Sequence, residues 1–126
     1  MRLVIISIVT VSIMSGCSKG TAAEKDTIPP VINLASPVSG QNFPTGQLIQ
    51  ITGNITDDKY IAEVHIHVTN TNTGSLLMDV HLYPGSSSTS FNQSITAASG
   101  INYKIQVIAK DRAVNETISS VEVTCN

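Results

Sequence analysis

The sequence predicts an all-β protein, an antiparallel β-sandwich of about seven strands, and three observations support this prediction. Short runs of residues alternate between apolar and polar side chains with a period of two, as half-buried strands do. Glycine, proline, asparagine, serine and aspartate separate these runs, which is typical of turns. No segment of ten or more residues carries the apolar stripe of a helix.

The strands are expected to follow one another along most of the chain. The first, "VINLASP", is a short edge strand that ends at a proline turn, and "SFNQSI" has the weakest alternation. The serine-rich segment "GSSSTS" before it is expected to be a loop. The expected strands span residues 31–37, 48–56, 61–68, 76–82, 90–95, 103–109 and 119–124.

The alternation also predicts which side chains face the core. In segment 61–68 it places Glu63, His65 and His67 on the outer face. The side chains expected to face inward are Ile49, Ile51, Ile55, Ala62, Val64, Ile66, Val68, Leu76, Met78, Val80, Leu82, Tyr103, Ile105, Val107, Ala109, Val121 and Val123.

The N-terminal residues have the pattern of a secretion signal. Arg2 supplies a positive charge, and residues 3–13 form an uncharged apolar run that is too short to span a bilayer well. The run ends in "MSGC", which resembles the lipobox of bacterial lipoproteins, in which the signal is removed and the cysteine carries a diacylglycerol. This resemblance implies a signal peptide at residues 1–16, a lipidated Cys17 and a tether at residues 17–27.

The same resemblance implies a location and a mode of membrane attachment. An aspartate directly after the lipidated cysteine resembles a signal for retention in the inner membrane. This chain has Ser18 at that position, so we expect an outer-membrane lipoprotein that faces the periplasm or the cell surface. Removing Arg2 with the signal leaves six basic against nine acidic residues. This acidity argues against a nucleic-acid partner and against electrostatic binding to anionic lipid. Attachment to the membrane is therefore expected through the N-terminal lipid alone.

Several motifs in register resemble the bacterial Ig-like domains of exported proteins. They are "DTIPP" at the start, "SPVSG" before the second strand, "TDD" after it and "YKIQVIAKD" near the end, within residues 26–124. The resemblance implies an immunoglobulin-like sandwich over residues 28–126 that serves binding, adhesion or spacing. Small lipoproteins that consist of one such domain and have no assigned function are similar to this chain.

Two residues bear on how such a domain is held together. With Cys17 lipidated, Cys125 is expected to be a free thiol, so the core alone stabilises the domain. Tyr103, shortly after a turn glycine in "SGINY", resembles a tyrosine corner, in which the hydroxyl bonds to nearby backbone. Tyr103 is therefore predicted to be structural.

The sequence contains no pattern typical of an active site. Serines are abundant but lie in turns, and Cys125 has no base near it in the sequence. There is no glycine-rich phosphate loop, no H-E-x-x-H and no C-x-x-C pair. We expect no catalytic residues and no enzyme activity.

Acidic residues are expected to gather at one end of the sandwich, where three loops meet. Carboxylate and amide oxygens from several loops are the ligands that Ca²⁺ takes, and cadherin-like domains bind it there. The alternative is turn chemistry, since Asp and Asn side chains bond to turn backbone. Valine at position 114 replaces a glycine of the related pattern, so the "DRAVN" loop is expected to follow a different path. The candidate Ca²⁺ ligands are Asp26, Asp57, Asp58, Asp111 and Asn115, with Lys59 and Arg112 as competing cations.

All three histidines lie in the segment "VHIHVTNTNTGSLLMDVHL". A hairpin closed with Thr71 opposite Ser75 pairs His65 with His81 and His67 with Asp79, all on the outer face. Three imidazoles and a carboxylate in one patch have the chemistry of a Zn²⁺ or Cu²⁺ site. The alternatives are a solvated sheet face, a register that separates the histidines, a pH-sensitive contact surface, and a partner-binding surface that includes Leu77 and Tyr83.

These inferences predict a lipid-anchored envelope protein whose Ig-like domain is a non-catalytic binding or adhesion module for a protein or glycan. The binding surface would be the histidine face or the acidic end. The alternatives are a metal-binding lipoprotein, with Ca²⁺ at the acidic end or Zn²⁺ or Cu²⁺ at the histidines, and a structural accessory of an envelope complex.

Overall fold

The computed structural model describes residues 24–126, and its regular structure is β throughout. The expectations for the signal peptide and for Cys17 fall outside these residues. No helix in the described part of the chain is long and apolar enough to cross a membrane. The strands are β1 (Val31–Ser36), β2 (Asn42–Phe43), β3 (Leu48–Asn70), β4 (Leu76–Leu82), β5 (Ser86–Thr96), β6 (Asn102–Asp111) and β7 (Glu116–Cys125).

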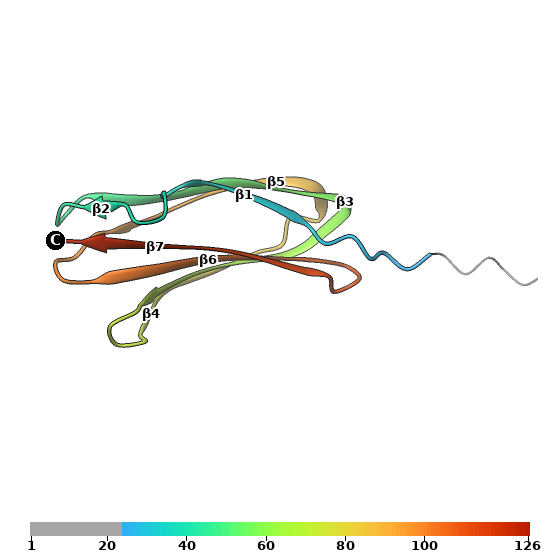
Figure 1. Ribbon diagram of the computed structural model, residues 1–126. Helices are drawn as coiled ribbons and strands as arrows, with labels where there is room; N and C mark the ends of the chain where they lie inside the picture. Colours follow the sequence, from blue (N-terminus) through green and yellow to red (C-terminus); the bar gives the residue numbers. More distant parts are fainter. Residues whose placement is uncertain (1–23) are drawn as a thin grey trace, which may run out of the picture.

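The strands form two layers, and β3 belongs to both (Figure 1). Its first half pairs antiparallel with β1 and β5, and its second half pairs antiparallel with β4 and β6. β7 pairs antiparallel with β6, and β2 adds a short parallel pairing to β7. The predicted all-β sandwich is confirmed.

β3 differs from the sequence prediction, which had two strands joined by a loop. The chain turns a corner without leaving extended structure, and pairing with β5 shifts between Thr56 and Ile61. At the corner the Oδ2 atom of Asp57 accepts hydrogen bonds from the backbone N–H groups of Lys59 (2.9 Å) and Tyr60 (2.8 Å). These bonds satisfy backbone donors that have no strand partner at the bend.

The core lies between the layers and contains most of the side chains predicted to face inward. Two predictions were wrong because bulges change the alternation. Ile61 is buried in place of Ala62, since the β3–β6 register shifts between Ile61 and Glu63. Leu76 is 57% exposed. The buried apolar side chains are Phe43, Ile49, Ile51, Ile55, Ile61, Val64, Ile66, Val68, Phe91, Ala97, Tyr103, Ile105, Val107, Ala109, Val123 and Cys125.

The serine-rich segment expected to be a loop is instead the first part of β5. Ser88 and Thr89 pair with Thr56 and Ile55 of β3. Serine and threonine satisfy the backbone pairing of a strand, and this part of β5 exposes most of its side chains to solvent. Composition alone therefore misassigned it.

Two side chains fix the end of the sandwich near the C-terminus. The hydroxyl of Tyr103 accepts a hydrogen bond from the backbone N–H of Ala98 at 2.8 Å, which is the tyrosine-corner geometry expected from the sequence. Cys125 is a free, buried thiol whose Sγ lies 3.6 Å from the hydroxyl oxygen of Thr45. The tyrosine bond ties the loop before β6 to the core.

Candidate functional site

The structure brings three of the acidic residues together at one end of the sandwich. Asp26 precedes β1, Asp57 lies at the corner of β3, and Asp111 ends β6. One carboxylate oxygen from each residue lies within 4.8 Å of the other two. Asp58, the next residue along β3, is exposed and does not belong to this group. We call Asp26, Asp57 and Asp111 the acidic pole.

Asp111 is the most deeply buried member of the acidic pole, with 3% of its surface exposed. Its Oδ1 accepts from the backbone N–H of Asn115 (2.9 Å), and its Oδ2 accepts from the Asn115 side-chain amide (2.7 Å). Burial acts to raise the pKa of Asp111, but hydrogen bonds from Asn115 and Ala113 outweigh it and hold the pKa below its ordinary value. Asn115 also donates to the backbone carbonyl of Asp26 at 2.9 Å. Its amide therefore orients two members of the pole.

Asp57 carries an oxygen that no group of residues 24–126 satisfies. Its Oδ2 takes the two corner hydrogen bonds, whereas its Oδ1 is buried and has no hydrogen-bond partner in the part of the chain that the structure describes. Asp26 uses its Oδ1 to accept from the backbone N–H of Ile28 at 3.1 Å. Within residues 24–126 no lysine or arginine forms an ion pair with any of the three carboxylates. Buried acceptors in this state normally have a cation or a water as partner.

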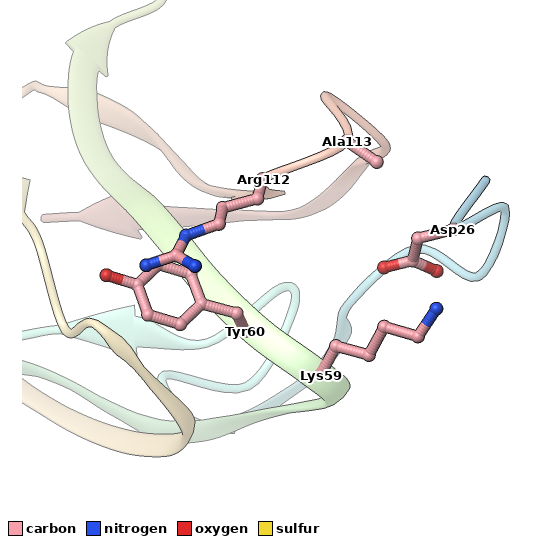
Figure 2. Close-up of a pocket in the computed structure, with 5 residues that line it drawn as sticks. All are labelled: Asp26, Lys59, Tyr60, Arg112 and Ala113. Carbon is pink, nitrogen blue, oxygen red and sulfur yellow. The ribbon is translucent and has the colours of Figure 1, made fainter. Parts of the chain in front are cut away.

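A pocket of about 400 Å³ opens beside the acidic pole. The guanidinium carbon of Arg112 lies 3.6 Å from the centre of the Tyr60 ring, and Figure 2 shows the two groups stacked. Lys59 extends toward Asp26 from the bend of β3 in the same view. The cations expected to compete for the carboxylates therefore line the pocket without pairing with them. The lining residues are Asp26, Lys59, Tyr60, Arg112 and Ala113.

The loop from β6 to β7 departs from the prediction made for Val114. Its φ is 67°, in the left-handed region, although a β-branched residue was expected to avoid that conformation. The side chain is 75% exposed, so it gains little from packing. The backbone N–H of Val114 donates to the carbonyl of Asp111 at 3.2 Å, and this turn maintains the strained conformation.

We predict that Val114→Gly raises the free energy of unfolding by about 1 kcal/mol, because glycine adopts this conformation without strain. Urea denaturation of the two proteins measures the difference. Ala113→Gly, one residue earlier, is the control and should lower stability by up to about 1 kcal/mol. Equal loss of stability in both variants would contradict the assignment of strain to Val114.

The histidines form a second cluster, on the outer face of β3 and β4. The register pairs His65 with His81 and His67 with Asp79, as predicted. The ring centroids of His65 and His81 are 3.9 Å apart, and those of His65 and His67 are 5.6 Å apart. One nitrogen from each of the three rings lies within 4.8 Å of the others.

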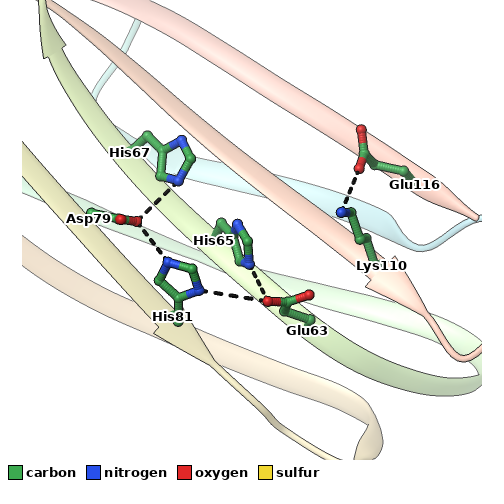
Figure 3. Close-up of polar contacts among 7 residues, drawn as sticks. All are labelled: Glu63, His65, His67, Asp79, His81, Lys110 and Glu116. Atoms are coloured by element: carbon green, nitrogen blue, oxygen red, sulfur yellow. Dashed lines mark hydrogen bonds and ion pairs between the residues drawn. The ribbon is translucent and has the colours of Figure 1, made fainter. Parts of the chain in front are cut away.

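Two carboxylates complete the cluster (Figure 3). The Oδ1 of Asp79 lies 3.1 Å from the Nε2 of His67 and 3.0 Å from the Nε2 of His81. The Oε1 of Glu63 contacts the Nε2 of His65 and lies 3.6 Å from the Nδ1 of His81. The hydrogen bond with His65 is the main cause that lowers the pKa of Glu63. We call Glu63, His65, His67, Asp79 and His81 the histidine face.

Glu63 was placed on the correct side of β3 by the sequence but was not included among the candidate ligands. Its spacing of two residues from His65 was the signal that could have identified it, because such residues are neighbours on one strand face. The predicted hairpin closure was also wrong. Asn70, and not Thr71, bonds to Ser75, because the register shifts by one residue between Val68 and Thr69. The shift lies between the turn and the histidines and offsets the different closure, so His65 still pairs with His81.

Residues 30–107 match a family model described as bacterial Ig domain, and this range covers more than half of the chain. The chain belongs to the bacterial Ig domain family. Domains of this kind are generally non-catalytic and are often extracellular or associated with the cell envelope. The sequence resemblance to Ig-like domains is therefore confirmed. No curated protein matches this Ig domain.

Solved structures share the fold of this Ig domain at low sequence identity. The fibronectin(III)-like modules of Clostridium thermocellum CbhA match with a TM-score of 0.51 and 24% identity, over 75% of this chain and 45% of that one. OgpA from Akkermansia muciniphila matches with a TM-score of 0.54 and 10% identity, over 79% of this chain and 29% of that one. A superoxide reductase (neelaredoxin) from Ignicoccus hospitalis has a TM-score of 0.51 and 11% identity, over 77% of this chain and 80% of that one. The Ig domain thus spans less than half the length of the first two, and the likeness concerns the fold.

Proposed function

We propose that this protein is a lipid-anchored protein of the bacterial cell envelope whose Ig domain is a non-catalytic binding module for a protein or glycan. The family match over residues 30–107 carries the proposal, because it accounts for most of the chain after "MSGC" with a domain type that is generally non-catalytic. The apolar run before "MSGC" supports anchoring at Cys17 in the outer membrane, toward the periplasm or the cell surface.

The edge of β4 supports a binding role, because apolar side chains gather on it. Among the strands of residues 24–126, β4 pairs only with β3, so its other edge has backbone groups that no strand of this range pairs with. Leu76, Leu77 and Tyr83 are exposed in or beside this strand, and the histidine face lies next to them. An open strand edge with apolar neighbours is a surface to which an extended peptide can add.

Anchoring is tested by metabolic labelling of the full-length protein with a radioactive fatty acid. We expect label on the protein, loss of label in Cys17→Ser, and accumulation of the precursor when globomycin is added. Cys125→Ser is the matched control, because the sequence contains two cysteines, and it should retain the label. An unlabelled protein, or a labelled Cys17→Ser variant, would refute the anchor.

Binding at the β4 edge is tested by a photo-crosslinking amino acid at Tyr83 in intact cells. Tyr83 is 71% exposed, and Val38, which is 66% exposed and lies between β1 and β2, is the matched control position. We expect a discrete adduct at position 83 and none at position 38. Absence of an adduct at 83, or the same adducts at both positions, would argue against the β4 edge as the binding surface.

The acidic pole supports a second candidate function, the binding of Ca²⁺. The unsatisfied, buried Oδ1 of Asp57 favours it, because Asp57 lies in a group with two more carboxylates and none of the three has a lysine or arginine partner within residues 24–126. Oxygens from Asp26, Asp57 and Asp111 suit Ca²⁺, which prefers carboxylate and carbonyl ligands. The hydrogen bonds of Asn115 to this group would then orient the ligands.

Ca²⁺ binding is tested by thermal unfolding in EDTA and in excess Ca²⁺. Ca²⁺ at about 100 times its Kd should add about 2.7 kcal/mol of stability and raise the midpoint. Asp57→Asn should abolish this gain, whereas Asp58→Asn, which changes the exposed neighbour, should preserve it. Equal midpoints in EDTA and Ca²⁺ would end the hypothesis, as would equal responses of the two variants.

A further inference from the structure

The histidine face contains all three histidines of the protein on two neighbouring strands. Both strands are held in register by antiparallel pairing that extends from Val64 to Val68 on β3. His65 and His67 belong to a central strand, since β6 pairs with β3 on the side opposite β4. The backbone positions of the imidazoles are therefore fixed before any ligand arrives, which reduces the entropy cost of binding.

We infer that the histidine face is a binding site for a divalent late transition-metal ion, Cu²⁺ or Zn²⁺. One nitrogen each from His65, His67 and His81 supplies three ligands, and the carboxylate of Asp79 supplies the fourth. Imidazole nitrogen is a preferred ligand of both ions, and N₃O sets of this kind suit them, whereas Ca²⁺ prefers oxygen.

The distances permit coordination after small side-chain rotations. Two nitrogens bound to one Zn²⁺ are at most about 4.2 Å apart, twice the usual Zn–N bond. The three nitrogens already lie within 4.8 Å of one another. The Oδ1 of Asp79 is 3.1 Å from the Nε2 of His67 and 3.0 Å from the Nε2 of His81, so it lies between two of the three imidazoles. A metal ion replaces the shared hydrogen bonds at this point with coordinate bonds.

The charges of the cluster also favour a divalent cation. Glu63 and Asp79 bring two negative charges to a patch whose other members are neutral when the imidazoles are unprotonated. Lys110 on the next strand, β6, pairs with Glu116 on β7 at 3.3 Å. Lys110 is the β3–β6 partner of Glu63 in the register, but the carboxylate of Glu63 contacts the imidazoles. A divalent ion balances the two carboxylates.

In the proposed site Glu63 orients the imidazole ligands and does not bind the metal ion itself. Its Oε1 contacts the Nε2 of His65 and lies 3.6 Å from the Nδ1 of His81. Carboxylates beside ligating imidazoles fix the tautomer and the ring orientation, and their loss typically lowers metal affinity about 10- to 100-fold. Gln106 and Ile108 of β6 flank His67 and His65 on the other side. The half-exposed cluster is open to ions from solution.

Isothermal titration of the untagged full-length protein with CuCl₂ and, separately, ZnCl₂ at pH 7.5 tests the site. We expect one ion per chain, with Cu²⁺ bound more tightly than Zn²⁺. His65→Gln, His67→Gln and His81→Gln should each weaken binding by more than about 100-fold, and Glu63→Gln by about 10- to 100-fold. Electron paramagnetic resonance of the Cu²⁺ complex should show coupling to three nitrogens.

Matched variants separate this site from other ligands in the chain. Cys125→Ser, Cys17→Ser and Asp57→Asn should leave the affinity for both ions unchanged, and circular dichroism should show that every variant is folded. Failure of the wild type to bind either ion overturns the proposal, as does binding that survives His81→Gln or that is lost in Cys125→Ser. The test does not depend on lipid anchoring or on Ca²⁺ at the acidic pole, so those proposals can fail without affecting it.

Discussion

Tyr103→Ala is expected to lower the free energy of unfolding by about 4 kcal/mol, the largest effect of any single change considered for this domain. The ring is 1% exposed and is among the largest fully buried side chains of the core. Its removal leaves a cavity between the two layers and deletes the hydroxyl that accepts from Ala98 N–H. Both losses act together, because the ring and the hydroxyl belong to one side chain.

Chemical denaturation measures the stability lost in Tyr103→Ala. One further variant separates the contribution of the hydroxyl from that of the ring, and another is the control. Tyr103→Phe keeps the ring and removes the hydroxyl, so it should cost about 1–2 kcal/mol through the Ala98 N–H that is left without its partner. Tyr83→Ala is the control, because Tyr83 is exposed and its replacement should change stability by less than about 0.5 kcal/mol. Similar losses at positions 83 and 103 would contradict the central place of Tyr103.

Gly53→Ala is expected to destabilise the domain by about 3 kcal/mol, because strand β1 and the core both approach Gly53 closely. A Cβ at this position would lie 2.2 Å from the backbone carbonyl oxygen of Asn33 and 2.6 Å from the Cζ of Phe91. The carbonyl cannot rotate away, since Leu34, the residue after Asn33, is the register partner of Gly53 in the β1–β3 ladder. β1 must therefore move, and its pairing with β3 weakens.

Gly100→Ala separates a steric clash from a general loss of glycine. Gly100 has a φ of +76° and no atom within 4 Å of an added Cβ, so alanine there introduces only backbone strain. The expected cost is about 1–2 kcal/mol. Urea midpoints and slopes for both variants provide the comparison. If Gly53→Ala lost no more stability than Gly100→Ala, β1 would have to move away from the added methyl group at little cost. That result would contradict the predicted clash.

The fold was predictable because period-two alternation is a local property that each strand displays independently. The core residues of β6 follow this alternation without interruption, and those of the first half of β3 follow it except at Gly53, which is only partly buried. The bulges near Ala62 and Leu77 were not predictable, since they depend on how neighbouring strands align. The corner of β3 was missed for a similar reason. Asp57 satisfies the backbone there, and "TDD" in a sequence is equally typical of a loop.

The histidine face could be predicted from the sequence more completely than the acidic pole. The pairing of His65 with His81 involves only two neighbouring strands and one turn, and it was predicted correctly because the bulge beside Thr69 offsets the error in the predicted closure. The acidic pole required segments far apart in the sequence to meet, and fold analogy suggested the meeting of Asp26 with Asp111. The unsatisfied oxygen of Asp57 could not be predicted, because burial of a single atom depends on the packing of the whole corner.

The course of β3 through both layers has a consequence for how the domain folds. Four of the other six strands in residues 24–126 pair directly with it, namely β1, β4, β5 and β6. Neither layer can complete its sheet without this one segment, so formation of the two halves is expected to be cooperative, without a stable half-sandwich intermediate. Its partners range from β1 to β6 along the chain, which gives a high contact order and favours slow folding on the millisecond-to-second scale.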